Sequence, residues 1–229
     1  MFDTVLFEFE GVIADTRNAR CGSLQQSLAE EGLGLTDEEF SESCTGFPVR
    51  DCVIAALAMR RAKRDETDVD LITLRTERFF YEQLGRGISL CPGAREFIAG
   101  LGGRARLGIV TRARRREVEY ILELSGLDSA FECIVTADEV LSPKPSPEPY
   151  EKAMERLSRR RISRPGATLA LEDAPTGILA AKSMKVRCVA VGQMPVYHAV
   201  NADAYVPSLE RQTLDSLSEL VRLGEARTR

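Results

Sequence analysis

The chain has a single histidine, His198, and no tryptophan among its 229 residues. One histidine excludes a metal centre built from several imidazoles, and it leaves any histidine-based catalytic triad with one candidate base. We interpret His198 as a surface or loop side chain. The six cysteines are scattered and no two are spaced as C-x-x-C, so we expect reduced and mostly buried thiols.

Long apolar runs and an excess of positive charge are also missing. No run of residues approaches the length that spans a bilayer, and no basic-then-apolar signal segment opens the sequence. The formal net charge of -4 gives no general attraction to nucleic acid or to anionic membranes. We therefore expect a cytoplasmic protein that binds neither nucleic acid nor membrane. For the oligomeric state we expect a monomer or weak homodimer.

Short apolar runs alternate with helical patterns along most of the chain, which predicts a parallel sheet covered by helices on both faces. Right-handed crossovers then bring the C-terminal ends of the strands to one edge of the sheet. The expected strands are Thr4–Phe9, Ala105–Val110, Cys133–Thr136, Ala167–Leu171, Val186–Val191 and Ala204–Val206. The expected helices are Gly93–Leu101, Arg114–Ser125, Glu148–Arg159, Pro175–Met184 and Leu209–Leu223.

One region breaks this alternation, because only helical patterns occur between the first two long strands. One helix start in this region is marked by Thr36, a capping residue, followed by acids in the first turn. We predict an α/β fold: a Rossmann-like doubly wound parallel sheet core of residues 1–15 and 88–229, with an inserted all-helical cap subdomain of residues 16–87. The expected cap helices are Arg17–Glu31, Thr36–Ser43, Val49–Arg64 and Val69–Leu84.

Two carboxylates follow the first apolar run, where Glu8 and Glu10 precede the turn residue Gly11. On an extended strand, side chains spaced i, i+2 point the same way. Open α/β sheets bind ligands at the C-terminal ends of their parallel strands, which is where these two acids fall. Taken alone, such a pair is more often a pair of exposed strand-end acids than a site.

Three further polar elements follow other predicted strands or precede a helix. Thr111 ends the second strand, Lys144 lies in a proline-flanked loop, and Glu172 with Asp173 ends another strand. In a doubly wound sheet all of these would meet Glu8 at one edge. A threonine hydroxyl and an ammonium can hold a phosphoryl group. Clustered carboxylates suit Mg²⁺, and one of them can serve as a nucleophile.

These four elements, in this order, resemble the four motifs of the haloacid dehalogenase superfamily of phosphotransferases. The run around Glu8 matches the first motif, and the runs Lys144–Tyr150 and Leu171–Lys182 match the later ones most specifically. The helical insertion resembles the cap of the phosphoglycolate phosphatase and β-phosphoglucomutase-like branch. The resemblance implies a Mg²⁺-dependent phosphatase of small phosphorylated metabolites that works through a carboxylate nucleophile.

Carried over by position, the resemblance gives each residue a role. It implies that Glu8 is the nucleophile and a metal ligand, and that Glu10 is the general acid and base, with its backbone carbonyl on the metal. Lys144 would serve catalysis and bind phosphate, and Glu172 with Asp173 would complete the Mg²⁺ site. The expected substrate contacts are Gly11, Thr111, Arg112 and Arg50.

The sequence departs from the family at both acids of the first motif, where glutamates stand in place of aspartates. The added methylene of Glu8 moves its carboxylate by roughly 1 Å, a displacement that can reduce a rate about a hundredfold. Three accounts are open: an inactive phosphatase-like protein that binds a phosphometabolite or protein partner, an active site adjusted to glutamates, or substitutions introduced into the chain. Dehalogenase chemistry is a weaker alternative, because that branch works without Mg²⁺, whereas Glu172 and Asp173 suit a metal ion.

Overall fold

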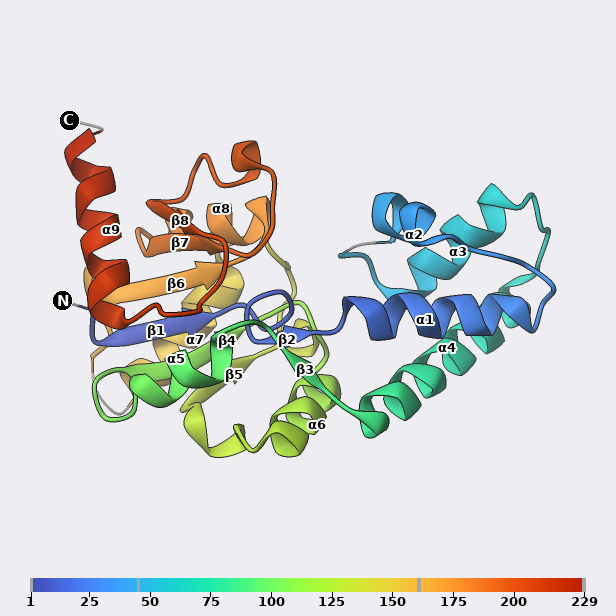
Figure 1. Cartoon of the computed structure of the whole chain (residues 1–229), viewed down its shortest axis with the longest axis horizontal. Helices are drawn as coiled ribbons and strands as arrows, with labels where there is room; N and C mark the ends of the chain where they lie inside the picture. The colour runs from blue at the N-terminus through green and yellow to red at the C-terminus, as the bar shows by residue number, and fades with distance from the viewer. Residues whose placement is uncertain (1, 45, 160–161, 228–229) are drawn as a thin grey trace. The chain divides into compact units, whose positions relative to one another are not determined.

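The computed structural model describes residues 2–44, 46–159 and 162–227 and divides the chain into two compact units (Figure 1). One unit comprises Met1–Asp15 with Ser89–Arg229, and the other comprises Thr16–Ile88. Each unit has its own cluster of buried apolar side chains. Among the described helices, none is long and apolar enough to cross a membrane.

The first unit is built on a six-stranded sheet with the order β5-β4-β1-β6-β7-β8, and every neighbouring pair in it is parallel. The expected α/β class and parallel core are thereby confirmed. The strand β1 pairs with β4 on one side and β6 on the other, so the acids that follow it lie near the centre of the edge formed by the C-terminal strand ends. The strands are β1 Thr4–Phe7, β4 Arg106–Val110, β5 Cys133–Val135, β6 Thr168–Glu172, β7 Arg187–Val191 and β8 Ala204–Val206.

Every residue of β1 is buried, because helices cover both faces of this sheet. Alternation sends Leu6 to one face, where it joins apolar side chains of α7 and α8, and sends Phe7 to the other. There the Phe7 ring packs edge-on against Phe97 of α5. The helices of this unit are α5 Ala94–Gly100, α6 Arg115–Ser125, α7 Glu148–Ser158, α8 Pro175–Ser183 and α9 Leu214–Arg227.

Several element boundaries differ from the expected ones. The first strand ends at Phe7, because the backbone then turns: the amides of Ile13 and Ala14 both donate to the Phe9 carbonyl. The helix α9 begins at Leu214, after Thr213 accepts a hydrogen bond from a first-turn amide. A short antiparallel pair, β2 Ala14–Asp15 with β3 Ser89–Leu90, was not expected from the sequence.

The second unit contains the helices α1 Arg17–Ala29, α2 Asp37–Ser43, α3 Val49–Met59 and α4 Glu66–Arg86. The predicted cap at Thr36 is confirmed, because its hydroxyl accepts from the Glu39 amide while the Glu39 carboxylate accepts from the Thr36 amide. Asp65 caps α4 with its carboxylate, which accepts from the Asp68 amide, so that helix begins three residues before the expected start. That these helices act as a cap stays a prediction.

An acid network beside β5 gives a test of stability against pH. Burial opposes the charge of Glu139, but Arg156, Arg115 and the Thr136 amide donate to its carboxylate and lower its pKa to about 2. A carboxylate with a lowered folded-state pKa stabilises the fold above its ordinary pKa, and this stabilisation is lost as the pH falls from about 4.5 towards 2.

Between pH 5 and pH 3, the free energy of unfolding should fall by about 1–2 kcal/mol more in the parent than in Glu139→Gln, as measured by urea unfolding. Glu155→Gln is the matched control, because Glu155 pairs with Arg159 at an exposed surface position. An equally steep fall in Glu139→Gln would contradict the assignment.

Candidate functional site

The C-terminal edge of the central strands gathers most of the polar residues singled out from the sequence. Glu8 follows β1, Thr111 follows β4, and Glu172 ends β6 with Asp173 directly after it. Lys144 reaches the same point from the loop before α7, through a cis Lys144–Pro145 peptide bond. The side chains of Glu8, Thr111, Lys144 and Glu172 are all buried.

Lys144 uses all three of its ammonium hydrogens within this cluster. Its Nζ lies 2.6 Å from Glu8 Oε2, 2.5 Å from Glu172 Oε1 and 2.7 Å from the Val110 carbonyl oxygen. Burial alone would lower the pKa of Lys144, but the charges of Glu172 and Glu8 outweigh it and raise the pKa above its ordinary value. Lys144 is therefore a fixed positive charge between two acids.

The Glu8 carboxylate is held by three donors. Its Oε1 accepts from the Phe9 amide at 2.7 Å and from the Thr111 hydroxyl, and its Oε2 accepts from Lys144. The Thr111 oxygen in turn accepts from the Ala113 amide at 3.1 Å, which fixes its position. Thr111 and Lys144, both expected to bind a phosphoryl group, thus already bind the carboxylate of Glu8.

Glu172 is fixed from two directions. Its Oε1 accepts from Lys144 and also from the Tyr150 hydroxyl at 2.5 Å. Its Oε2 lies against Gly177 in the first turn of α8, where an added Cβ would stand 1.8 Å from that oxygen. Burial, opposed by Lys144 and assisted by the charge of Glu8, raises the pKa of Glu172 to about 7.

Asp173 completes a cluster of acids. One carboxylate oxygen each from Glu8, Glu172 and Asp173 lies within 4.8 Å of the others. Burial, then the charges of Glu8 and Glu172, raises the pKa of Asp173 well above its ordinary value. Three acids brought together in this way repel one another unless a cation or protons compensate them.

The donor set of this cluster fits Mg²⁺. Mg²⁺ prefers carboxylate and water oxygens, and all three acids offer such oxygens. The backbone also leaves room for the carboxylates. Gly11 has a φ of +76°, and a Cβ there would stand 2.2 Å from Asp173 Oδ2. Glycine at position 11 therefore allows both the turn and the close approach of Asp173.

Three predicted site residues, Glu10, Arg112 and Arg50, have other surroundings, although the charge of Glu10 contributes to the raised pKa of Asp173. Glu10 lies partly exposed in the turn after β1 and bridges to Ala14, and Arg112 is exposed directly after Thr111. Arg50 belongs to the helical unit, where its Nε lies 3.0 Å from Asp70 Oδ1 in an exposed ion pair. The proposed roles of Glu10, Arg112 and Arg50 stay predictions.

Sequence reasoning missed three contacts of the cluster. Two come from the backbone: the Phe9 amide and the Val110 carbonyl, which bind Glu8 and Lys144. The third is the hydroxyl of Tyr150, which the sequence presents as part of an apolar helix face. Tyr150, Ala153, Met154 and Leu157 recur at helical spacing, so the pattern indicates a core position and gives no sign of the Glu172 contact.

The sequence of this chain is similar to those of known proteins. A model of the haloacid dehalogenase-like hydrolase family matches residues 5–191. The pyrophosphatase PpaX of Oceanobacillus iheyensis is 28% identical over 189 residues, which cover 82% of each chain. The family match extends over all four of the sequence elements that form the cluster.

Solved structures agree with the architecture. The crystal structure of CbbY from Rhodobacter sphaeroides in complex with phosphate has a TM-score of 0.80 and 25% identity, covering 95% of this chain and all of the other. The structure of β-phosphoglucomutase from Clostridium difficile also has a TM-score of 0.80, with 19% identity and complete coverage of both chains. At that identity the second likeness concerns the fold alone.

Proposed function

The chain belongs to the haloacid dehalogenase-like hydrolase family, and from that premise we propose that it is a Mg²⁺-dependent phosphatase of small phosphorylated metabolites. The observation that supports this most is the buried contact of Lys144 with both Glu8 and Glu172, beside Thr111 and Asp173. It joins an acid nucleophile, anion-binding donors and a set of metal-binding oxygens at one sheet edge. The relatives named above act on, or are bound to, phosphate compounds, which agrees with this substrate class.

In the proposed reaction the Glu8 carboxylate attacks phosphorus, forming an O–P bond as the bond to the leaving alcohol breaks. Glu10 donates a proton to that alcohol and then accepts one from the water that hydrolyses the acyl phosphate, releasing inorganic phosphate and regenerating Glu8. Lys144 and Thr111 hold the phosphoryl oxygens. Glu8, Glu172 and Asp173 would hold Mg²⁺, which when bound would supply positive charge to the same oxygens.

A second candidate function is favoured by the hydrogen bonds of Glu8. Because Thr111, Lys144 and the Phe9 amide all donate to its carboxylate, a phosphoryl group would have to displace these contacts before binding. A protein in this state could keep the fold and bind a phosphometabolite or a protein partner without turnover. The two candidates differ in whether the chain hydrolyses any phosphate ester.

The test is hydrolysis of an aryl phosphate and a panel of metabolite phosphates with and without Mg²⁺. We expect slow release of inorganic phosphate that requires Mg²⁺ and that falls at least a thousandfold in Glu8→Gln, since an amide cannot form the acyl phosphate. Glu119→Gln, at an exposed helix position, is the control and should leave turnover unchanged. Absence of turnover across the panel would favour the binding protein.

A further inference from the structure

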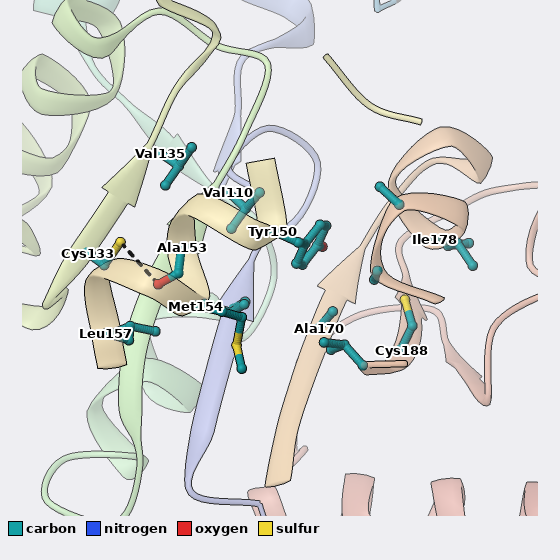
Figure 2. Packing of buried hydrophobic residues seen from close by; sticks show 14 of the residues in the cluster. Val110, Cys133, Val135, Tyr150, Ala153, Met154, Leu157, Ala170, Ile178 and Cys188 are labelled. Atoms are coloured by element: carbon teal, nitrogen blue, oxygen red, sulfur yellow. Dashed lines mark hydrogen bonds between the residues drawn. The ribbon is translucent and has the colours of Figure 1, made fainter. Parts of the chain in front are cut away.

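Tyr150 is fully buried, and its hydroxyl is an unusual feature of its surroundings. The side chain lies on α7 within an apolar cluster that includes Val110, Ala153, Ala170 and Ile178 (Figure 2). The Tyr150 hydroxyl donates to Glu172 Oε1 at 2.5 Å, so this position carries a polar contact in addition to its packing.

That contact decides how the two oxygens of Glu172 are used. Oε1 accepts two hydrogen bonds, one from Tyr150 and one from Lys144, whose positive charge disfavours a cation at the same atom. Oε2 is then the oxygen left for a metal ion. Gly177 makes room for it, because any Cβ there would overlap Oε2. Rotation of the carboxylate is limited on one side by two donors and on the other by the backbone of α8.

We propose that Tyr150 is a positioning residue for the metal site: its hydroxyl fixes the Glu172 carboxylate so that Oε1 stays with Lys144 and Oε2 faces Mg²⁺. This inference rests on the proposed Mg²⁺-dependent function. Without the hydroxyl, Lys144 would be the remaining side-chain donor to Oε1, and the carboxylate could turn about its terminal bond. Groups that orient metal ligands typically contribute ten- to hundredfold in metal affinity.

Mg²⁺ binding measured by calorimetry on the full chain tests this directly. We expect Tyr150→Phe to weaken Mg²⁺ affinity about ten- to hundredfold while its circular dichroism and packing are retained. Tyr205→Phe is the matched control, because it removes a tyrosine hydroxyl that donates to the Gly192 carbonyl oxygen instead of to Glu172. Equal Mg²⁺ affinity in the parent and a folded Tyr150→Phe variant would overturn the proposal.

A second variant approaches the same carboxylate from its other side. Gly177→Ala places a methyl group against Glu172 Oε2 and should also weaken Mg²⁺ binding, whereas Gly166→Ala, which faces open space, should not. If Tyr150→Phe fails to fold, this pair still tests the premise of the proposal, that Mg²⁺ binding requires Glu172 Oε2 in this position. Unchanged affinity in a folded Gly177→Ala variant would count against a carboxylate that is fixed in position.

A double-mutant cycle separates positioning from general destabilisation. In a Glu172→Gln background, Tyr150→Phe should cause no further loss of Mg²⁺ affinity, because the group that it orients is no longer a carboxylate. A full additional loss would show that Tyr150 acts elsewhere. These readouts are independent of turnover. A parent chain that binds Mg²⁺ but hydrolyses no ester would disprove the proposed phosphatase activity and leave the role of Tyr150 standing. A parent chain that binds no Mg²⁺ would overturn the role of Tyr150.

Discussion

Replacing Lys144 with methionine is expected to abolish phosphate-ester hydrolysis and to lower the free energy of unfolding by about 3–5 kcal/mol. Methionine keeps most of the side-chain volume but removes the charge that lies between Glu8 and Glu172. Removing one partner of a buried ionic cluster leaves the other charges uncompensated, and this is more destabilising than the net value of the pair suggests. The phosphoryl group would also lose its cationic partner.

The loss of stability in Lys144→Met should depend on pH. Without the ammonium, the pKa of Glu172, already about 7, rises further. A carboxylate with a raised folded-state pKa destabilises the fold most above that pKa, and protonation removes this effect as the pH falls. The deficit relative to the parent should therefore shrink between pH 7 and pH 5, as measured by urea unfolding.

Lys63→Met provides the control for this experiment. Lys63 is exposed in the helical unit, so its replacement should change the unfolding free energy by less than about 0.5 kcal/mol and leave turnover intact. A Lys144→Met variant that is as stable as the parent at pH 7 would show that the Lys144 ammonium does not stabilise the folded protein. A variant that keeps parental turnover would remove Lys144 from the proposed reaction.

Sequence alone was sufficient to predict the parallel sheet and the edge where Thr111, Lys144 and Glu172 meet. Strand ends are encoded locally: a buried apolar run such as Val5–Phe7 stops where a charged residue follows it, and parallel connection brings such ends together. Lys144 was recognisable because prolines flank it just before a helix. These features depend on short segments and on the handedness of the crossovers.

The specific contacts were not predictable in the same way. That Tyr150 donates to Glu172 depends on the packing of α7 against the sheet, whereas its sequence pattern indicates only a buried helix face. That Glu8 takes the hydrogen bonds of Thr111 depends on the length of one side chain within a folded cluster. Arg50 likewise binds Asp70 across two helices, a pairing that no local pattern indicates.

Shortening Glu8 to aspartate is expected to raise turnover about a hundredfold over that of the parent. In the parent, the Glu8 carboxylate receives hydrogen bonds from Thr111, Lys144 and the Phe9 amide. Removing one methylene withdraws the carboxylate by roughly 1 Å, which frees Thr111 and Lys144 to bind phosphoryl oxygens and places the nucleophile for in-line attack. The measurement is kcat/KM for the aryl phosphate at saturating Mg²⁺.

The affinity for inorganic phosphate gives an independent measure of the same change. Glu8→Asp should bind phosphate more tightly than the parent, because the donors no longer have to leave the carboxylate first. Glu10→Asp, added to Glu8→Asp, should have a smaller effect, since proton transfer tolerates a flexible side chain or an intervening water. Glu119→Asp, at the helix surface, should change neither quantity. If Glu8→Asp left both turnover and phosphate affinity at parental levels, the length of residue 8 would not limit this site, and the competition between its carboxylate and a phosphoryl group would be disproved.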